Sequence, residues 1–561
     1  MIVVTRLKTT ENLNISRYLP EMARRYPNQP AVVTGVGYDA QGKVIYEQRT
    51  FAELDCESDA YAWGLTAYGI DRGKRVLLMV RPGLPLIALT FALFKAGCIP
   101  ILIDPAMGKR NLSTCIEECH PDALIGVERA HIARLIFRNA FRSVQKLVTV
   151  GKRWAWSGVT LDELQAEVQT PFPIEEMHTE DEAAILFTTG STGIPKGVLY
   201  EHGMFNAQCD LLCELYGIEP GEVDMPAFPL FALFNVAMGV TSAIPDLDPT
   251  RPASCDPAKI VEIINDQRVT MTFGSPAIWN KVSQYCLDHA IRLPTLRRIL
   301  MAGAPVPLHL HERFQSILNP FADTYTPYGA TESLPIASIG GQEILEVTAA
   351  RNDITAGTCV GRPAPDVTMR IIPIIDDEIT EWDDNLALPP YHIGEIVVKG
   401  PVVTKQYVNR PQSTRLAKIH EGATVWHRMG DLGYLDVADR LWFYGRKSHR
   451  VELRDQCLYT EPCEMIFNQH ADVYRSALVG FQQNGEMVAA MVIEPEAGRM
   501  PNNEAARMRF VEELRTLGAR HTMTSGITLI LFHPSFPVDI RHNAKIFREQ
   551  LAVWAQKQVS N

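Results

Sequence analysis

The 561-residue chain lacks several features that mark other classes of protein. It contains no apolar run close to the roughly 20 residues that a membrane-spanning helix requires, and the longest run, residues 84–94, is closed by Lys95. Acidic residues outnumber basic ones, 65 Asp and Glu against 54 Lys and Arg, which gives a net charge of −11. An acidic chain is poorly suited to broad electrostatic binding of nucleic acid. We therefore expect neither an integral membrane segment nor a nucleic-acid partner.

Patterns typical of disulfide frameworks and metal centres are also missing. The 11 cysteines include no C-x-x-C pair, and no H-E-x-x-H sequence or other clustered metal-ligand spacing is present. The amino-terminal sequence MIVVTRLK lacks the layout of a secretory signal. These absences predict reduced cysteines in the core and a cytoplasmic location.

What the sequence does contain is a globular composition, 46% hydrophobic and 21% charged, in a chain too long for one ordinary core. Strand-like and helix-like segments alternate, which favours a layered α/β architecture with mostly parallel sheets. The clearest are helices over residues 51–68, 84–96 and 111–118 and strands over residues 75–80, 99–104 and 123–127.

The pattern changes near residue 446, which predicts a second, smaller domain. The last part of the chain shows strands over residues 477–481, 486–494 and 527–532 and helices over 504–517 and 546–556. We therefore expect an N-terminal domain of residues 1–446 and an α+β C-terminal domain of residues 447–561. The charged run at residues 446–450 lies at the junction, where it is either a hinge or a solvated turn.

The strongest local signal is the sequence TTGSTGIPKG at residues 188–197, directly after a predicted strand at 183–187. Its glycines permit positive φ and close approach of the backbone, so that amide N–H groups can converge on an anion. The hydroxyls and Lys196 add donors and a positive charge that suit a polyphosphate. The sequence differs from a Walker A motif, because Gly197 follows the lysine where that motif has Ser or Thr.

Three further polar segments are each weak alone. YTPYGATE at residues 325–332 offers Tyr328 to stack a purine and Glu332 to bind Mg²⁺ through oxygen. WHRMGDLGY at 426–434 and LWFYGR at 441–446 offer Asp431 for ribose hydroxyls and Arg446 as a donor. PVDIRHNAKI at 537–546 is a polar loop with Lys545.

In this order and spacing, the four segments resemble the adenylate-forming superfamily of acyl-CoA synthetases, nonribosomal adenylation domains and beetle luciferases, over almost the whole chain. Within it, the sequence looks most like the β-lactone synthetases of bacterial long-chain olefin biosynthesis. FPLFALF at 228–234, IPDLDPTRP at 244–252 and FPVDIRHNAK at 536–545 carry this closer match. The resemblance implies a large multi-subdomain N-terminal domain and a small mobile C-terminal domain.

The resemblance also implies a role for each matching position. Thr188 and Lys196 match the phosphate loop, Lys545 the lysine that bridges the carboxylate and the α-phosphate, Glu332 the Mg²⁺ ligand, and Ser448 the hinge. The remaining matches are expected to bind ATP: Thr189, Gly190, Ser191, Thr192, Gly193, Gly303, Ala304, Pro305, Tyr328, Gly329, Thr331, Asp431, Phe443 and Arg446. Apolar residues are plentiful, and Phe231, Phe234, Met238 and Trp279 are candidates for lining an acyl tunnel, with ordinary core packing as the alternative.

Departures from the thioester-forming relatives narrow the expected activity. Where these relatives have a K-x-x-G-x-R-type stretch along the pantetheine route, this chain has Glu452, Asp455 and Cys457, and Ala232 stands where histidine is common. Transfer to CoA is therefore in doubt, while the adenylation positions are filled. The resemblance predicts ATP- and Mg²⁺-dependent conversion of a 2-alkyl-3-hydroxyalkanoic acid to a β-lactone, with a fatty acyl-CoA or acyl-AMP ligase as the alternative. It also implies pathway partners: a condensing enzyme, a reductase and a β-lactone decarboxylase.

Overall fold

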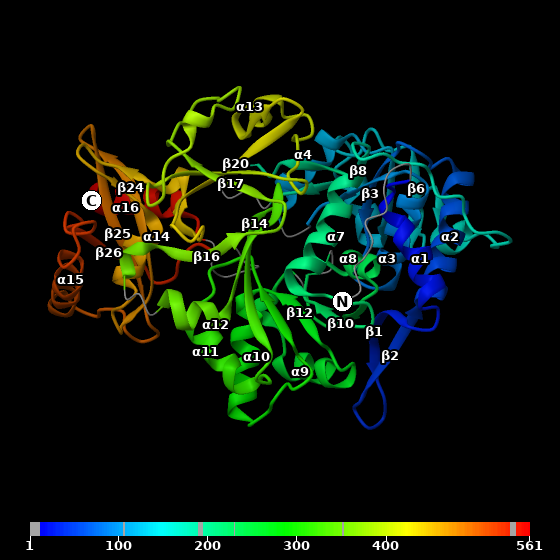
Figure 1. Ribbon diagram of the computed structural model, residues 1–561, viewed down its shortest axis with the longest axis horizontal. Helices are drawn as coiled ribbons and strands as arrows, with labels where there is room; N and C mark the ends of the chain where they lie inside the picture. Colours follow the sequence, from blue (N-terminus) through cyan, green and yellow to red (C-terminus); the bar gives the residue numbers. More distant parts are fainter. Residues whose placement is uncertain are drawn as a thin grey trace.

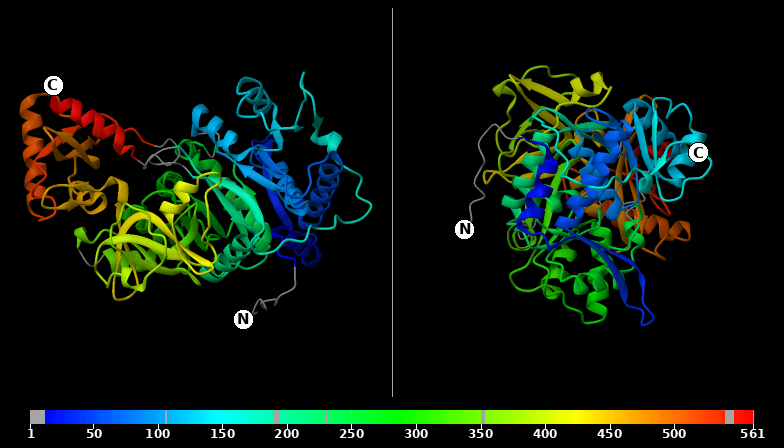
Figure 2. Two further views of the ribbon diagram at one scale, coloured as in Figure 1. Left: turned by 90° about the horizontal axis from the view of Figure 1, so that it is seen from above. Right: turned by 90° about the vertical axis from the view of Figure 1, so that its right-hand side faces the viewer.

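The computed structural model describes residues 12–104, 107–188, 194–228, 231–248, 250–349, 353–538 and 546–560. Within these ranges the chain forms a large N-terminal body built around two extensive sheets and a small C-terminal body set to one side, as Figures 1 and 2 show. This arrangement agrees with the predicted α/β class and its smaller α+β unit.

The first sheet has seven strands, and all neighbours except the last pair are parallel. Its strands, in spatial order, are β7 (Val159–Thr160), β6 (Lys146–Val150), β5 (Ala123–Val127), β3 (Arg75–Met79), β4 (Ile99–Leu102), β8 (Glu182–Phe187) and β9 (Gly197–Glu201). The helical connections between β3, β4 and β5 make this part a series of β-α-β units, as the alternating pattern predicts. β8 and β9 form an antiparallel pair that encloses the candidate phosphate loop.

The second sheet has 14 strands, and its two halves differ in direction. Strands β1 (Pro30–Tyr38), β11 (Thr241–Ile244), β10 (Val223–Pro226), β12 (Met271–Gly274), β13 (Arg298–Met301) and β14 (Asp323–Ala330) are parallel, and β2 (Val44–Thr50) pairs antiparallel at the edge. The antiparallel half contains β15 (Ser333–Gly340), β16 (Thr358–Pro363), β21 (Leu441–Arg446), β20 (Thr424–Leu435), β19 (Lys418–Glu421), β18 (Gly394–Lys399) and β17 (Thr368–Ile372). The alternating β-α pattern did not predict this antiparallel half.

Helices lie against the sheets (Figure 1), and their buried apolar side chains form the core together with those of the strands. They are α1 (Tyr18–Arg25), α2 (Phe51–Tyr68), α3 (Leu84–Lys95), α4 (Lys109–Cys119), α5 (Glu128–Ile136), α6 (Leu161–Leu164), α7 (His202–Tyr216), α8 (Phe231–Met238), α9 (Pro257–Asp266), α10 (Pro276–Asp288), α11 (Leu308–Ile317), α12 (Gly341–Glu343) and α13 (Pro411–Ala417). α2 has the predicted bounds because Thr50 and Glu53 form a reciprocal capping box at its start, and Gly69 ends it at φ 84°. α3, the longest apolar run, is a buried core helix. Among the described residues, no helix has the length and apolar character needed to cross a membrane.

The small C-terminal body begins after the 3₁₀ turn Lys447–His449 and has its own core. It comprises β22 (Val451–Glu452), β23 (Cys457–Leu458), α14 (Thr460–Phe467), β24 (Val473–Gln483), β25 (Glu486–Pro495), α15 (Glu504–Ala519), β26 (Leu529–Phe532) and α16 (Arg548–Ser560). At the junction, a Cβ on Gly445 would lie 2.1 Å from Oγ1 of Thr460, so only glycine permits this approach of β21 to α14. The expected boundary after residue 446 falls at the end of β21.

Candidate functional site

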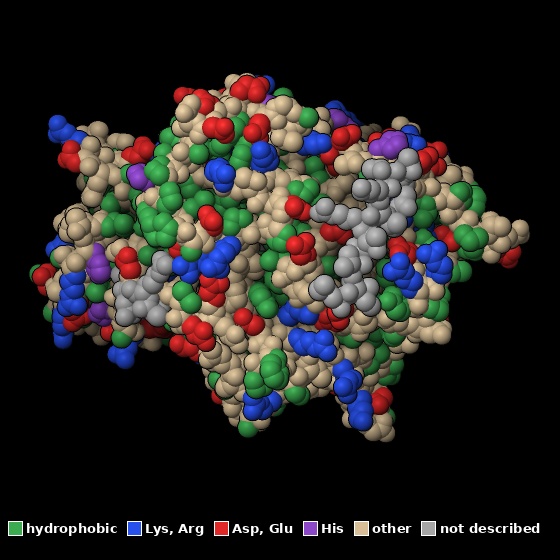
Figure 3. Space-filling model, viewed as in Figure 1, with side chains coloured by type: hydrophobic (Ala, Val, Ile, Leu, Met, Phe, Trp, Pro, Cys, Tyr) green, Lys and Arg blue, Asp and Glu red, His purple; other side chains and the backbone are tan. Residues whose placement is uncertain are grey.

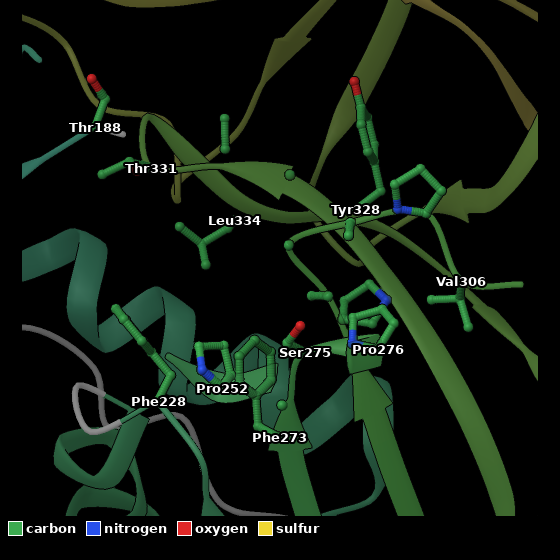
Figure 4. A pocket seen from close by; sticks show the side chains of 18 of the residues that line it. Thr188, Phe228, Pro252, Phe273, Ser275, Pro276, Val306, Tyr328, Thr331 and Leu334 are labelled. Atoms are coloured by element: carbon green, nitrogen blue, oxygen red, sulfur yellow. The ribbon is translucent and has the colours of Figure 1, made fainter. Parts of the chain in front are cut away.

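A single large cleft, with a volume of ≈ 3480 Å³, lies between the two sheets of the large body and extends to the small one. The carboxyl ends of the parallel strands β12 and β13 open into it, which is where ligands bind in open α/β sheets. In Figure 4, Phe228 and Phe273 lie across the pocket from Thr188 and Thr331. The cleft thus joins a polar region to an apolar one.

The base of the candidate phosphate loop is closed by two hydrogen bonds. The Thr188 amide donates to the carbonyl of Lys196 at 3.0 Å, and the Lys196 amide donates to Oγ1 of Thr188 at 3.1 Å. Both residues line the cleft. Thr189, Gly190, Ser191, Thr192 and Gly193 lie outside the described residues.

Glu332, the expected Mg²⁺ ligand, also lines the cleft and is held by residues of the connection that follows β18. Its Oε1 accepts a hydrogen bond from the hydroxyl of Tyr407 at 2.6 Å, and its carbonyl accepts from the amide and hydroxyl of Thr404, both at 2.9 Å. The Tyr407 ring lies under the ammonium of Lys196, with Nζ 4.8 Å from the ring centroid. One buried tyrosine thus contacts both the carboxylate and the loop lysine.

A single carboxylate is compatible with Mg²⁺, which keeps several waters and is usually held by one or two carboxylates together with substrate phosphates. The described residues contain no group of three or more His, Cys, Asp or Glu side chains that could form an all-protein metal site. Glu332, beside the phosphate loop, therefore fits a metal that arrives with a polyphosphate.

Behind Glu332 lies a buried pair of basic residues, Lys418 and His427, that sequence reasoning did not identify as a pair. Lys418 donates hydrogen bonds to the carbonyl and hydroxyl of Thr404, and burial lowers the pKa of Lys418 to about 7. His427, its register partner on β20, lines the cleft. Burial lowers the pKa of the His427 imidazole well below its usual value, and the neighbouring Lys418 lowers it further. Lys418 does not stand out in the sequence, and its proximity to His427 depends on the β19–β20 pairing.

The expected nucleoside contacts come together on three strands. Asp431 and Arg446 are register partners on β20 and β21, with Nη1 of Arg446 3.0 Å from Oδ1 of Asp431. The Tyr328 hydroxyl on β14 donates to the other oxygen of Asp431, and the rings of Tyr328 and Phe443 lie 5.9 Å apart. Burial raises the pKa of Asp431, and Arg446 acts against this shift.

The backbone that is expected to lie beside adenine forms the turn after β13. Gly303 has φ 90°, a conformation that favours glycine, and Gly303, Ala304 and Pro305 all line the cleft. Gly329 and Thr331 line it from the β14–β15 turn, where a Cβ on Gly329 would lie 2.7 Å from the carbonyl of Ser333. All five of these positions line the same cleft as Tyr328.

At the apolar end, Phe231, Phe234 and Met238 on α8 line the cleft. The Phe231 ring stacks on Phe273 with centroids 3.8 Å apart. Trp279 does not fit the expected tunnel: its side chain is fully buried in the core of the large body, where it packs against Phe314. Trp279 is absent from the cleft lining among the described residues, so we interpret it as a core residue.

Lys545 lies outside the described residues, but its neighbour Ile546 and Arg548 on α16 both line the cleft. Arg548 forms a two-pronged ion pair with Glu464, at 2.8 and 2.6 Å. The proposed hinge residue Ser448 is exposed in the 3₁₀ turn between the bodies. On either side of it, Lys447 and Arg450 pair with Glu395 and Asp376 of the large body.

The overall fold matches those of solved adenylate-forming enzymes. The amide bond synthetase McbA from Marinactinospora thermotolerans superposes with a TM-score of 0.78 at 22% identity, over 97% of this chain and 99% of that one. O-succinylbenzoate coenzyme A synthetase from Bacillus subtilis, solved with ATP and magnesium, superposes with a TM-score of 0.73 at 21% identity, over 95% and 98% of the two chains. At these identities the likeness concerns the fold.

Family membership follows from the sequence comparisons: the chain belongs to the AMP-binding enzyme family, whose model matches residues 19–408. It is 45% identical to an olefin beta-lactone synthetase from Xanthomonas campestris pv. campestris, over 98% of this chain and 99% of that protein. It is 46% identical to an olefin beta-lactone synthetase from Stenotrophomonas maltophilia, over 97% and 98%. A long-chain-fatty-acid–CoA ligase from Thermus thermophilus matches at 24% over 70% of the chain. The predicted superfamily and its closer branch are thereby confirmed.

Proposed function

We propose that the protein uses ATP to convert a 2-alkyl-3-hydroxyalkanoic acid to a β-lactone through an acyl-adenylate, with release of AMP and pyrophosphate, in long-chain olefin biosynthesis. The observation that carries this proposal is the full-length identity of 45–46% to two olefin beta-lactone synthetases. The convergence of Thr188, Lys196 and Glu332 on one cleft supports the adenylation half of the reaction.

In the first step, a carboxylate oxygen of the acid attacks the α-phosphorus of ATP, and pyrophosphate leaves. The nucleoside is held by Tyr328, Asp431 and Arg446, while the phosphate loop and Lys196 hold the polyphosphate. Lys545 bridges the carboxylate and the α-phosphate, which is the role that the resemblance implies for it. When bound, Mg²⁺ on Glu332 adds positive charge at the phosphates, and catalysis is mainly positional and electrostatic.

In the second step, the 3-hydroxyl of the same acid attacks the activated carbonyl, AMP leaves and the hydroxyl proton is released. Because the nucleophile and the electrophile belong to one molecule, a high effective molarity replaces a second binding site. Closure of a strained four-membered ring requires the site to hold the hydroxyl near the carbonyl and to exclude water.

The hairpin after the hinge supports a reaction without a thiol. Glu452 and Cys457 are register partners on β22 and β23, and Oε1 of Glu452 accepts from Nε of Arg450 at 2.7 Å. Asp455 lies in the turn between the two strands. At the aligned positions, Glu452, Asp455 and Cys457 take the place of the lysine, glycine and arginine of the thioester-forming relatives.

The alternative is a fatty acyl-CoA or acyl-AMP ligase, favoured by the similarity to a coenzyme A synthetase in fold and to a long-chain-fatty-acid–CoA ligase in sequence. The deciding experiment incubates the protein with ATP, Mg²⁺ and a synthetic 3-hydroxy acid, with and without CoA, and follows the acid by mass spectrometry. Formation of a product one water lighter in the absence of CoA is expected. A product that requires CoA and carries it would instead identify a ligase.

We also propose that the protein works in the cytoplasm and associates with the condensing enzyme, reductase and β-lactone decarboxylase of the same pathway. On the face seen in Figure 3, acidic and basic side chains are interspersed with hydrophobic ones. Co-purification of a tagged chain with these three enzymes from a producing cell tests this association.

A further inference from the structure

One segment of this acidic chain is strongly basic. Residues 129–153 contain seven Lys and Arg residues and no Asp or Glu, although the chain as a whole has a net charge of −11. The segment runs from α5 to the loop that follows β6, and it also carries exposed apolar side chains. The expected nucleotide contacts lie on other elements, so this combination of side chains calls for another explanation.

The exposed side of α5 is apolar. Leu135 is 44% exposed and Ile136 is 68% exposed. Ile132, one turn earlier on the same side of the helix, is half-buried. Single exposed apolar residues are common on protein surfaces, but a group of them marks a surface that contacts another molecule or a membrane.

The loop after β6 adds an exposed tryptophan to this surface. Trp154 is 60% exposed, and its ring stacks on Trp156 with centroids 5.9 Å apart. Trp156 in turn stacks on His131 of α5 at 5.2 Å and donates from Nε1 to Oγ1 of Thr149 at 2.9 Å. Two stacked rings and a hydrogen bond therefore hold Trp154 in an exposed position beside α5.

The basic side chains around these apolar residues are only partly neutralised. Arg153 pairs with Glu163 at 2.9 Å, whereas Arg129, Arg134 and Arg138 form no ion pair with any residue that the structure describes. Nε of Arg134 is buried without a hydrogen-bond partner among these residues. Partial burial lowers the pKa of Arg134, and the nearby guanidinium of Arg138 lowers it further. Cations that repel each other and lack an acidic partner are stabilised by an anion from outside the chain.

Exposed apolar side chains among unpaired cations fit the surface of a membrane with anionic headgroups. Tryptophan favours the boundary between headgroups and acyl chains, and a negatively charged leaflet attracts Lys and Arg. We propose that a patch on α5 and the loop after β6 docks the protein on an anionic lipid bilayer. This α5 patch consists of Arg129, Ile132, Arg134, Leu135, Ile136, Arg138, Lys152 and Trp154.

An acidic protein is the competing partner for the α5 patch. The centre of a typical protein interface is depleted of charged residues, whereas here Arg134 directly precedes the exposed Leu135, and Arg138 follows two residues after the exposed Ile136. Close mixing of cations with apolar side chains is typical of helices that lie in a membrane interface. The composition of the patch therefore favours a lipid surface.

The α5 patch lies next to the cleft, because α5 borders the cleft with Ala130 and Ala133 on another side of the helix. Docking would keep the cleft close to a bilayer, in which a long-chain acid is far more concentrated than in water. Binding of the protein to lipid does not require the proposed reaction, so the two proposals can fail separately.

The test is flotation with vesicles of phosphatidylcholine, alone or mixed with phosphatidylglycerol, in the absence of ATP and acid. The wild type should bind the anionic vesicles alone, and high salt should weaken this binding because it screens the charges. Each cation near an anionic surface contributes about a fivefold effect, so the double variant Arg134→Glu/Arg138→Glu should bind about 30-fold or more weakly.

A second variant tests the apolar part of the α5 patch. Trp154→Ala should weaken binding by about tenfold, because the buried apolar area of the indole is lost. It should also remove most of the quenching of tryptophan fluorescence by lipids brominated in the acyl chains. Quenching that is unchanged in Trp154→Ala would show that this side chain does not enter the bilayer and would overturn the proposal.

The matched control for the charge reversal is Arg507→Glu/Arg509→Glu on α15, which makes the same change on either side of an exposed apolar residue, Met508 (66% exposed). The control should bind as the wild type does, and thermal unfolding should show equal stability of all variants. Absence of wild-type binding to anionic vesicles, or equal weakening by the control, would overturn the proposal. Loss of a co-purifying protein in Arg134→Glu/Arg138→Glu, without vesicle binding by the wild type, would instead identify a protein interface.

Discussion

Replacement of Tyr407 by phenylalanine probes the link between the expected Mg²⁺ ligand and the phosphate loop. Tyr407 is 5% exposed, and burial, together with Glu332, raises the pKa of its hydroxyl, so the hydroxyl stays protonated and donates to the carboxylate. The substitution removes this hydrogen bond but keeps the ring under Lys196. Tyr407→Leu removes both contacts.

The size of the effect follows from the charge of the acceptor. A hydrogen bond to a charged group contributes about 1.5–3 kcal/mol net, and about 1.4 kcal/mol corresponds to a factor of ten. Tyr407→Phe should therefore lower kcat/KM for ATP at limiting Mg²⁺ by roughly 10- to 100-fold. High Mg²⁺ should restore part of this loss, because the carboxylate is mispositioned but still present. Tyr407→Leu should lose more, and high Mg²⁺ should restore less.

The assay is acid-dependent pyrophosphate exchange over a Mg²⁺ titration. A matched control is Tyr61→Phe, which removes another buried tyrosine hydroxyl that donates to a glutamate, Glu57, at 3.0 Å. Neither Tyr61 nor Glu57 lines the cleft. This control should leave the Mg²⁺ dependence unchanged. If Tyr407→Phe shows the wild-type Mg²⁺ profile, the hydroxyl does not position Glu332 and the reasoning is refuted.

Three further substitutions test other parts of the site. Lys545→Ala should lower pyrophosphate exchange by about 100-fold or more at unchanged thermal stability, and near-normal exchange would exclude its bridging role. Asp431→Asn, which keeps the shape but loses the charge beside Arg446, should raise KM for ATP by about tenfold, as steady-state kinetics at saturating acid can check. Lys418→Met concerns pH: the folded pKa of about 7 lies below the ordinary 10.5, so the unfolded chain binds the extra proton between these values. Between pH 8 and 9, the free energy of unfolding of the wild type should therefore rise relative to that of the variant by about 1.4 kcal/mol per pH unit. Urea unfolding at several pH values measures this difference, and parallel pH profiles of the two proteins would contradict it.

The alternating part of the fold could be predicted because each element carries its own signal. α2 begins at its capping box and ends at a glycine, and β5 has the predicted bounds. The antiparallel half of the large sheet could not be predicted as a whole, because some of its strands pair across long sequence distances, as β16 does with β21. Periodicity describes one segment at a time and says nothing of such partners.

Candidate site residues could be named from the sequence where they belong to a recognisable motif. Tyr328, Asp431 and Arg446 come from separate segments, and the structure joins them in one network. Trp279 shows the limit of residue type as a guide, because an aromatic side chain suits a tunnel and a core equally. Tyr407 and Lys418 were missed because their importance arises only from contacts made in the folded chain.

The central claim, that the carboxylate is activated by adenylation and the hydroxyl then attacks it, can be tested by following oxygen atoms. The 3-hydroxy acid is labelled with ¹⁸O at both carboxylate oxygens and incubated with ATP and Mg²⁺, and the AMP and lactone are analysed by mass spectrometry. The account predicts one ¹⁸O in AMP and one in the lactone carbonyl. A lactone that retains both labels, with unlabelled AMP, would show that the hydroxyl is the activated group and would contradict the account.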